Sequence, residues 1–469
     1  MSSSFLASLF QWLTFSDLKA ALASRLGDPL KVHWIDDELG RYIKEALRTY
    51  NAISQLQRTR VVFPTKVGKA FYDLTSTADP DTFVGGTGVL TTNPPLNCGY
   101  SILDQELIND IQYPLIEPIT TNFTVLGLPP PTDQFTLDDI TRAIERRRNL
   151  FLLHTATHIS HSQPNYPAPP NSGRVPLSDS TISLRRISWR NADGAYTPLY
   201  REDENEANLL LLDWGVNSSI PQAYAQYLTP PSSVQIIPPS NDAGKLDILS
   251  TISPADLNPA VGTLLSIPDD WAWVLKYGSL SDLLTKDSQS SDPRFAYAEQ
   301  RYVDGLRLAS MLPLIQQAVI NGSYVQPTSL SDLDAAIPSW QNDTPAAPTT
   351  LAIAGRNLVA LYPVPDSAAY EVQLDITRNF PVPVISTDKV QIPRESIARI
   401  LDYCVHLATF KEGLAEFEQT YPLATSFMQH CLLHNSILSA EASHYDIVKG
   451  FSSKEEIDRP RYYQKEEVA

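Results

Sequence analysis

Repeated markers at one constant separation constrain the fold of this chain more than any other feature of its sequence. Three pairs of residues lie 125 positions apart: Pro238 and Pro363, Ile267 and Ile392, and Lys286 and Lys411. Around these markers the chain repeats one order of strand, turn, strand, Ile-Pro dipeptide and helices. A fixed period that spans several elements is typical of a duplicated unit.

The second copy of this pattern predicts two helices and a pair of strands. Its helical region, residues 392–440, carries two apolar stripes at helical spacing. One stripe holds Ile397, Ile400, Leu401, Leu407 and Phe410, and the other holds Phe427, Cys431, Leu432 and Leu438. Upstream, residues 358–363 and 370–376 predict two strands separated by a turn at Pro365 and Asp366.

A second offset links two helices in the first half of the chain. Leu39 and Ile43 recur 101 residues later as Ile140 and Ile144. The parts of the repeat therefore follow one another as front, front, back, back. Either the second copy is inserted inside the first, or the two halves pair crosswise.

The nested arrangement divides the chain into four segments. Residues 1–130 form the front half of the first unit, and residues 131–315 form an inserted second unit. Residues 316–442 form the back half of the first unit, and residues 443–469 form a C-terminal extension. The extension is charged and has aromatic residues but lacks a sustained apolar face.

The patterns predict an α+β fold that is mainly helical: a duplicated helix bundle with short β-strand pairs. The clearest element is an amphipathic helix with Asp36 as its N-cap. Its apolar stripe consists of Leu39, Ile43, Ala46, Leu47 and Tyr50. The apolar segment 1–14 has no basic residue before it and no cleavage pattern, so we expect a packed first helix there rather than a secretory signal.

Composition excludes several classes of protein. The formal net charge of −17 argues against a surface that grips nucleic-acid phosphates. Cys98, Cys404 and Cys431 are far apart, which indicates buried reduced thiols rather than a disulfide framework or a zinc site. No apolar run approaches the length of a membrane span, so we expect synthesis in the cytoplasm and no membrane partner.

Two histidine groups have helical spacing. His154, His158 and His161 could share one helix face and bind a metal ion, but no carboxylate or cysteine accompanies them, which favours local packing. His430 and His434 are interpreted as structural residues. We therefore expect no metal site.

Other chemical candidates have simple structural explanations. The acidic groups at 36–38, 138–139 and 269–270 each precede a predicted helix, where helix-end charge accounts for them. The basic run 146–148 could bind phosphate, but in an acidic chain an exposed face or an interface pair is favoured. Trp271, Trp273 and Tyr277 indicate core or a subunit contact. Because the chain has no phosphate loop, dinucleotide fingerprint, serine elbow or zincin motif, we expect no enzyme activity, no catalytic residues and no cofactor.

Several short strings together resemble the head-to-tail adaptor (connector) proteins of tailed bacteriophages. The strings lie at residues 18–22, 35–39, 42–47, 267–272, 276–284, 402–403 and 410–413. They are patterns of helix faces rather than catalytic signatures, and they touch most of residues 15–440 in pieces. The chain departs from this family in its size, because these adaptors are often much shorter.

The resemblance implies a structural protein of the virion neck, made in the bacterial cytoplasm. Such a protein forms a ring, commonly of twelve copies, between the portal and the tail, and lines the channel through which DNA leaves without specific binding. The implied partners are the portal protein, further neck or tail proteins and copies of the chain itself. The implied portal-docking residues lie in the C-terminal extension: Phe451, Arg459, Arg461, Tyr462 and Tyr463.

Two other classes of protein remain open. A tail or baseplate structural protein would share the composition and the lack of active-site motifs. An enzyme with an unfamiliar site would need convergent polar groups in one pocket.

Overall fold

The computed structural model describes residues 10–74, 101–120, 123, 134–168, 171, 173–203, 219–228, 232–287 and 293–435. It is 41% helical and 25% strand. The expectation of a mainly helical bundle with short strand pairs is wrong, because the strands build one seven-stranded sheet and two four-stranded sheets. Many of these strands pair with partners far away in the chain, and local periodicity does not reveal such pairing.

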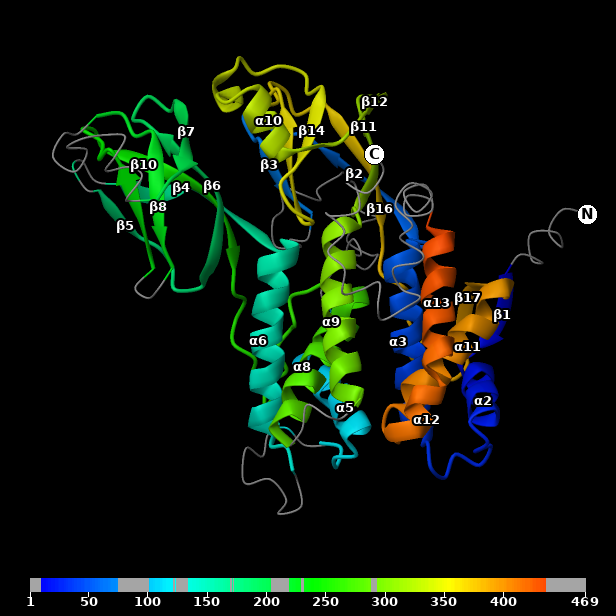
Figure 1. The fold of residues 1–469 in the computed structure, drawn as a ribbon. Coiled ribbons are helices and arrows are strands. Elements are labelled where there is room, and N and C mark those ends of the chain that lie inside the picture. Colours follow the sequence, from blue (N-terminus) through cyan, green and yellow to red (C-terminus); the bar gives the residue numbers. More distant parts are fainter. Residues whose placement is uncertain are drawn as a thin grey trace, which may run out of the picture.

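The helices stand in two groups below the sheets (Figure 1). In the first group α3 packs against α11 and α13, and in the second group α8 packs against α6 and α9. The first group contains α2 (Phe15–Arg25), α3 (Asp36–Ser54), α11 (Arg394–Thr409), α12 (Leu414–Gln419) and α13 (Tyr421–His434). The second contains α5 (Asp104–Leu115), α6 (Leu137–Thr155), the 3-10 turn η2 (Asp269–Trp271), α8 (Ala272–Asp287) and α9 (Pro293–Met311).

Both helix groups share one hydrophobic core. Apolar side chains of α3, α8, α9, α11 and α13 belong to the same buried cluster. The predicted stripe of α3 is confirmed, since Leu39, Ile43, Ala46, Leu47 and Tyr50 are all fully buried. The burial of this stripe fixes which face of α3 turns toward its neighbours.

Helices α3 and α6 have the same length and end in the same way. Each has 19 residues, and α6 begins 101 positions after α3. Each ends on a left-handed residue, Gln55 after α3 and Ala156 after α6. Their starts differ: Thr136 caps α6 through its side chain, whereas the N-cap of α3 is Ile35, so the prediction that Asp36 caps this helix is wrong.

The seven-stranded sheet has the order β4-β10-β6-β7-β8-β9-β5 and lies beside the upper end of α6 (Figure 1). Apolar side chains of several of its strands form a separate small core. The strands are β4 (Ile159–Ala168), β5 (Arg174–Pro176), β6 (Thr181–Arg190), β7 (Tyr196–Arg201), β8 (Ala223–Tyr227), β9 (Ser233–Ile237) and β10 (Gly244–Ile252).

Two four-stranded sheets cover the upper ends of the helices (Figure 1). One has the order β12-β11-β16-β2 and the other β13-β14-β15-β3, with α10 (Leu330–Ala336) and the 3-10 turn η3 (Trp340–Asn342) beside the second. The strands are β2 (Arg58–Pro64), β3 (Phe71–Asp73), β11 (Ile315–Ile320), β12 (Ser323–Val325), β13 (Thr328–Ser329), β14 (Thr350–Ile353), β15 (Leu358–Tyr362) and β16 (Glu371–Thr377).

The two strand pairs expected from the sequence do not pair with each other. Strands β15 and β16 belong to different sheets, and β9 and β10 are not neighbours within their sheet. Both sides of β16 are already occupied, by β2 and β11. The marker proline Pro238 directly follows β9, and Pro363 directly follows β15. The peptide bond before each proline is cis.

Strand pairing follows a nested order along the chain. Strands β2 and β3 pair with β16 and β15, whereas β4 and β5 pair with β10 and β9. The segment boundaries at residues 130, 315 and 442 stay a prediction.

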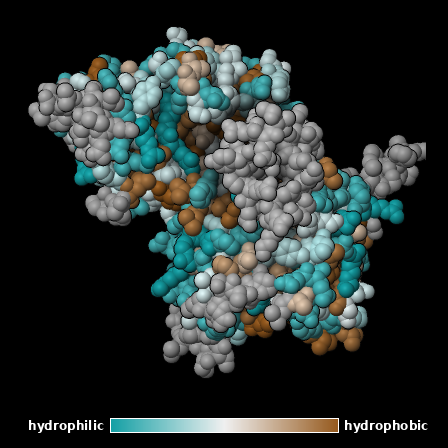
Figure 2. Space-filling model, viewed as in Figure 1, coloured by the Kyte–Doolittle hydropathy of each residue, from teal (hydrophilic) through white to brown (hydrophobic). Residues whose placement is uncertain are grey.

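The N-terminal segment is partly a strand. Strand β1 (Phe10–Thr14) pairs antiparallel with β17 (Lys389–Pro393), so the helix expected for residues 1–14 is wrong for its last five residues. The two-stranded sheet formed by β1 and β17 lies at the outer edge of the first helix group (Figure 1). On the face in Figure 2, hydrophilic surface predominates and hydrophobic residues gather in a few separate patches.

Candidate functional site

The five residues that the resemblance assigns to portal docking lie outside the described part of the chain. They are Phe451, Arg459, Arg461, Tyr462 and Tyr463. Their role stays a prediction.

The three histidines with helical spacing do not share a helix. His154 lies in the last turn of α6, which ends at Thr155, and His161 lies on β4. The ring nitrogen Nε2 of His161 lies 2.6 Å from a carboxylate oxygen of Asp247 on β10. Among the described residues no group of three or more His, Cys, Asp or Glu side chains is placed to hold a metal ion.

The basic run 146–148 forms contacts within the chain. Arg147 on α6 donates to Asp282 on α8 at 2.6 Å and to Glu299 on α9 at 2.9 Å. Arg146 also pairs with Asp282, and Arg148 is fully buried and donates to the carbonyl of Ala255. This run therefore holds the second helix group together.

The aromatic residues of α8 belong to the core and surround a buried arginine. The guanidinium of Arg301 on α9 lies 4.4 Å from the ring centre of Trp273 and 5.7 Å from that of Tyr277. It donates to the hydroxyl of Tyr403 on α11 at 2.7 Å, so the cage joins the two helix groups. Burial raises the pKa of Tyr277, which keeps the phenol neutral beside the cation.

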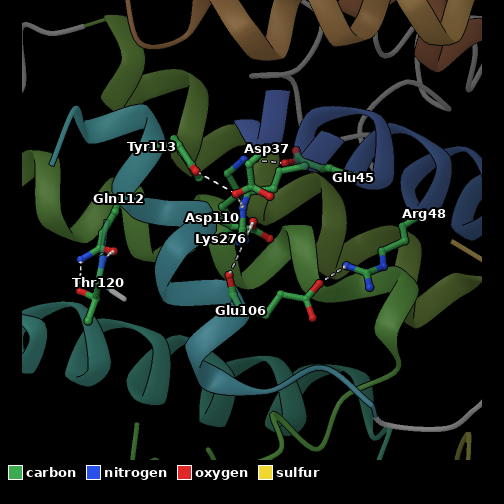
Figure 3. A network of polar contacts seen from close by, with 10 residues as sticks. Asp37, Glu45, Arg48, Glu106, Asp110, Gln112, Tyr113, Thr120 and Lys276 are labelled. Carbon is green, nitrogen blue, oxygen red and sulfur yellow. Dashed lines mark hydrogen bonds and ion pairs between the residues drawn. The ribbon is translucent and has the colours of Figure 1, made fainter. Parts of the chain in front are cut away.

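A network of polar contacts joins α3 to α5 and α8 (Figure 3). Lys276 on α8 donates to Glu45 on α3 at 2.5 Å, and both side chains are buried. Arg41 on α3 donates to Asp110 on α5 at 2.7 Å. Burial raises the pKa of Asp110, although the charge of Arg41 opposes this shift. Because each of these contacts crosses between elements, they fix the register of α3 against the second helix group.

The acidic pair of η2 forms its own hydrogen bonds to other segments of the chain. Asp269 accepts a hydrogen bond from the backbone N–H of Ser101 at 2.8 Å. Asp270 accepts from the side-chain amide of Asn51 on α3 at 2.5 Å and from the backbone N–H of Phe380 at 3.1 Å. Both aspartates lie in the first turn of η2, as expected for helix-end charge, and they also tie η2 to distant segments, which the sequence did not predict.

Asp270 has a strongly altered acidity. Burial raises the pKa of its carboxyl group to about 7, against the opposing effects of the Asn51 and Phe380 hydrogen bonds and the charge of Arg48. A carboxyl group with this pKa changes its charge within the physiological range.

A pocket opens beside Asp270 and has an empty volume of about 390 Å³, open mouth included. We call it the junction pocket because the end of α3, η2, the turn before β15 and the segment after β16 all contribute to it. Its lining residues are Ala52, Thr157, Pro268, Asp270, Trp271, Leu314, Arg356, Thr377, Arg378 and Asn379.

Sequence reasoning missed the junction pocket. Arg356 lies in the connection between β14 and β15, and Arg378 directly follows β16. Neither residue belongs to a sequence motif. Only the Asp269-Asp270 pair was visible, as a group of acids before a helix.

No protein-family model matches the chain, and no curated protein matches it significantly. None of the helices in the described ranges has both the length and the apolar character that crossing a membrane requires.

Proposed function

We propose that this chain is a structural protein of a tailed-phage virion that forms a ring between portal and tail. The observation that carries the proposal is where the adaptor-like strings lie. They fall on α2, α3, η2, α8 and α11, and on the turn after α11. Although they are spread over about 400 residues of sequence, apolar residues from each of these elements pack into one hydrophobic core.

The charge of the chain suits a conduit for DNA. A net charge of −17 repels the phosphate backbone. The basic residues of α6, which could have gripped DNA, are largely engaged with Asp282 and Glu299. DNA can therefore pass such a lumen without specific binding.

Exposed apolar residues on ordered loops supply surfaces for assembly. Leu30 and Val32, between α2 and α3, are 83% and 78% exposed. Val384 and Ile385 are 75% and 60% exposed, and Asp388 holds their loop by accepting from both backbone N–H groups. A ring needs two different faces of each subunit that meet, and apolar side chains held out from an ordered loop favour such contacts.

Attachment to the portal is assigned to residues 443–469, by analogy with the extension of the adaptor family. Deletion of the residues after His444 should leave the fold intact and weaken co-purification with the portal of the same phage. The matched control replaces the same residues by a Gly/Ser segment of equal length, which separates sequence-specific docking from a length effect. Undiminished portal binding by both variants would remove the extension from the proposal.

A further inference from the structure

The junction pocket places two arginines in a chain that is otherwise strongly acidic. Arg356 comes from the turn between β14 and β15, and Arg378 follows β16. The carboxyl group of Asp270 lies in the same lining. The local charge of the pocket is therefore positive when Asp270 is protonated, whereas the whole chain carries −17.

The side chain of Arg356 and the backbone of Arg378 are anchored by their surroundings. Arg356 donates from Nη1 to the carbonyl of Ala309 at 2.8 Å, and its guanidinium lies 5.6 Å from the ring centre of Trp271. The backbone of Arg378 donates to the carbonyl of Gln57 at 2.8 Å and accepts from the side chain of Asn51 at 2.6 Å. The anchored guanidinium of Arg356 loses little freedom when a ligand binds.

Arg378 also has a donor that the protein leaves unused. Its Nε is buried and has no hydrogen-bond partner among the residues that the structure describes. A buried donor without an acceptor destabilises the folded chain, so the site favours a ligand that supplies acceptor oxygens. Thr157, Thr377 and Asn379 add hydroxyl and amide groups to the same lining.

We propose that the junction pocket binds a small free inorganic oxyanion, of the sulfate or phosphate class, between Arg356 and Arg378. Planar guanidinium groups match the geometry of such oxygens and form strong, charge-assisted hydrogen bonds. The proposal is independent of the proposed virion role, because it concerns only the contacts around this pocket.

The charge of Asp270 sets the pH dependence of binding. The charged groups around it are Asp269 on η2, Arg48 on α3, and Arg356 and Arg378 across the pocket. The arginines keep their charge at neutral pH. Protonated Asp270 can donate to the anion, whereas the ionised carboxylate repels it. Affinity therefore falls as the pH rises through about 7, the pKa of Asp270.

Isothermal titration with sulfate, at constant ionic strength in chloride, tests the proposal. Sulfate keeps its charge between about pH 6 and about pH 8, so a pH effect reports on the protein. We expect saturable binding that is weaker at the higher pH. Arg378→Gln should weaken binding by about tenfold or more, and Arg378→Lys by less. Arg142→Gln, on the exposed face of α6, is the matched control and should bind sulfate as the parent chain does.

The outcomes separate the proposal from its rivals. Absence of saturable sulfate binding by the unmodified chain overturns it, whatever the variants do. Equal affinity of the Arg378→Gln and Arg142→Gln variants for sulfate contradicts the assignment of the binding site to the junction pocket. Tighter binding of methyl phosphate than of sulfate contradicts the proposal that the ligand is a free inorganic ion. It indicates instead that the ligand is an oxyanion group carried on a larger molecule. Loss of the pH effect in Asp270→Asn supports the role given to Asp270.

Discussion

Lys276 Nζ donates a hydrogen bond to Glu45 Oε2 at 2.5 Å, and this buried ion pair joins α8 to α3 (Figure 3). Lys276→Met leaves the Glu45 carboxylate buried without its counter-charge. We expect a loss of about 3–5 kcal/mol in the free energy of unfolding, because a buried charge without a partner is strongly unfavourable. Denaturant titration followed by circular dichroism measures this loss.

An exposed ion pair of the same chain provides the control. Arg142 and Asp138 on α6 are 76% and 66% exposed at their side chains, so Arg142→Met should cost less than about 1 kcal/mol. The double variant Lys276→Met, Glu45→Leu should be more stable than Lys276→Met alone, since it removes both charges. Equal costs for Lys276→Met and Arg142→Met would contradict the structural role of the buried pair.

Asp270 should make the fold less stable as the pH rises. Its pKa is about 7 in the folded chain and 3.8 as a free side chain, so the folded state holds a proton that the unfolded state releases. The stability that this group contributes is complete below pH 3.8 and is lost as the pH rises to about 7, by roughly 4 kcal/mol. Asp270→Asn cannot titrate. Denaturant unfolding between about pH 5 and about pH 8 should therefore show a smaller decline in the variant than in the parent chain.

His406 should act in the opposite sense. Burial lowers the pKa of His406 to about 3 from 6.5, with the charge of Arg301 adding to the shift. As the pH falls below 6.5 the unfolded chain gains a proton that the folded chain excludes, so stability is lost toward pH 3. His406→Gln should lose less stability than the parent between about pH 6.5 and about pH 4.5, by about 2 kcal/mol. Parallel stability curves would count against a buried neutral imidazole.

The buried thiols should resist chemical modification. Cys404 and Cys431 are both fully buried, and burial raises the pKa of each thiol. In a Cys98→Ser background, a thiol reagent such as dithionitrobenzoate should label neither cysteine in the native protein and both in denaturant, because the reactive species is the thiolate. Rapid native labelling would show that the core opens readily.

The elements predicted well from the sequence are those with long helical periodicity. The apolar stripes of α3 and α11 are buried as expected, because 3.6-residue spacing specifies both the helix and the face it buries. Strand pairing was not predictable in the same way. Strand β6 reads Thr-Ile-Ser-Leu-Arg-Arg-Ile-Ser-Trp-Arg, and its burial depends on β10, which lies about sixty residues later.

The candidate site shows a similar division. Asp270 was visible in the sequence, but its raised pKa comes from burial, which arises only when distant segments enclose the carboxyl group in the folded chain. The arginines of the junction pocket come from separate loops and carry no local signal. The tail aromatics and arginines at 451–463 lie outside the described residues, so only experiment addresses them.

The measurement that tests the proposed function most directly is the native mass of the complex formed when this chain is co-expressed with the portal protein of its phage. The account predicts a portal-bound ring with one copy of this chain for each portal subunit. A chain that does not bind the portal but assembles with other tail components would contradict the neck assignment. That result would place the protein in the tail or baseplate.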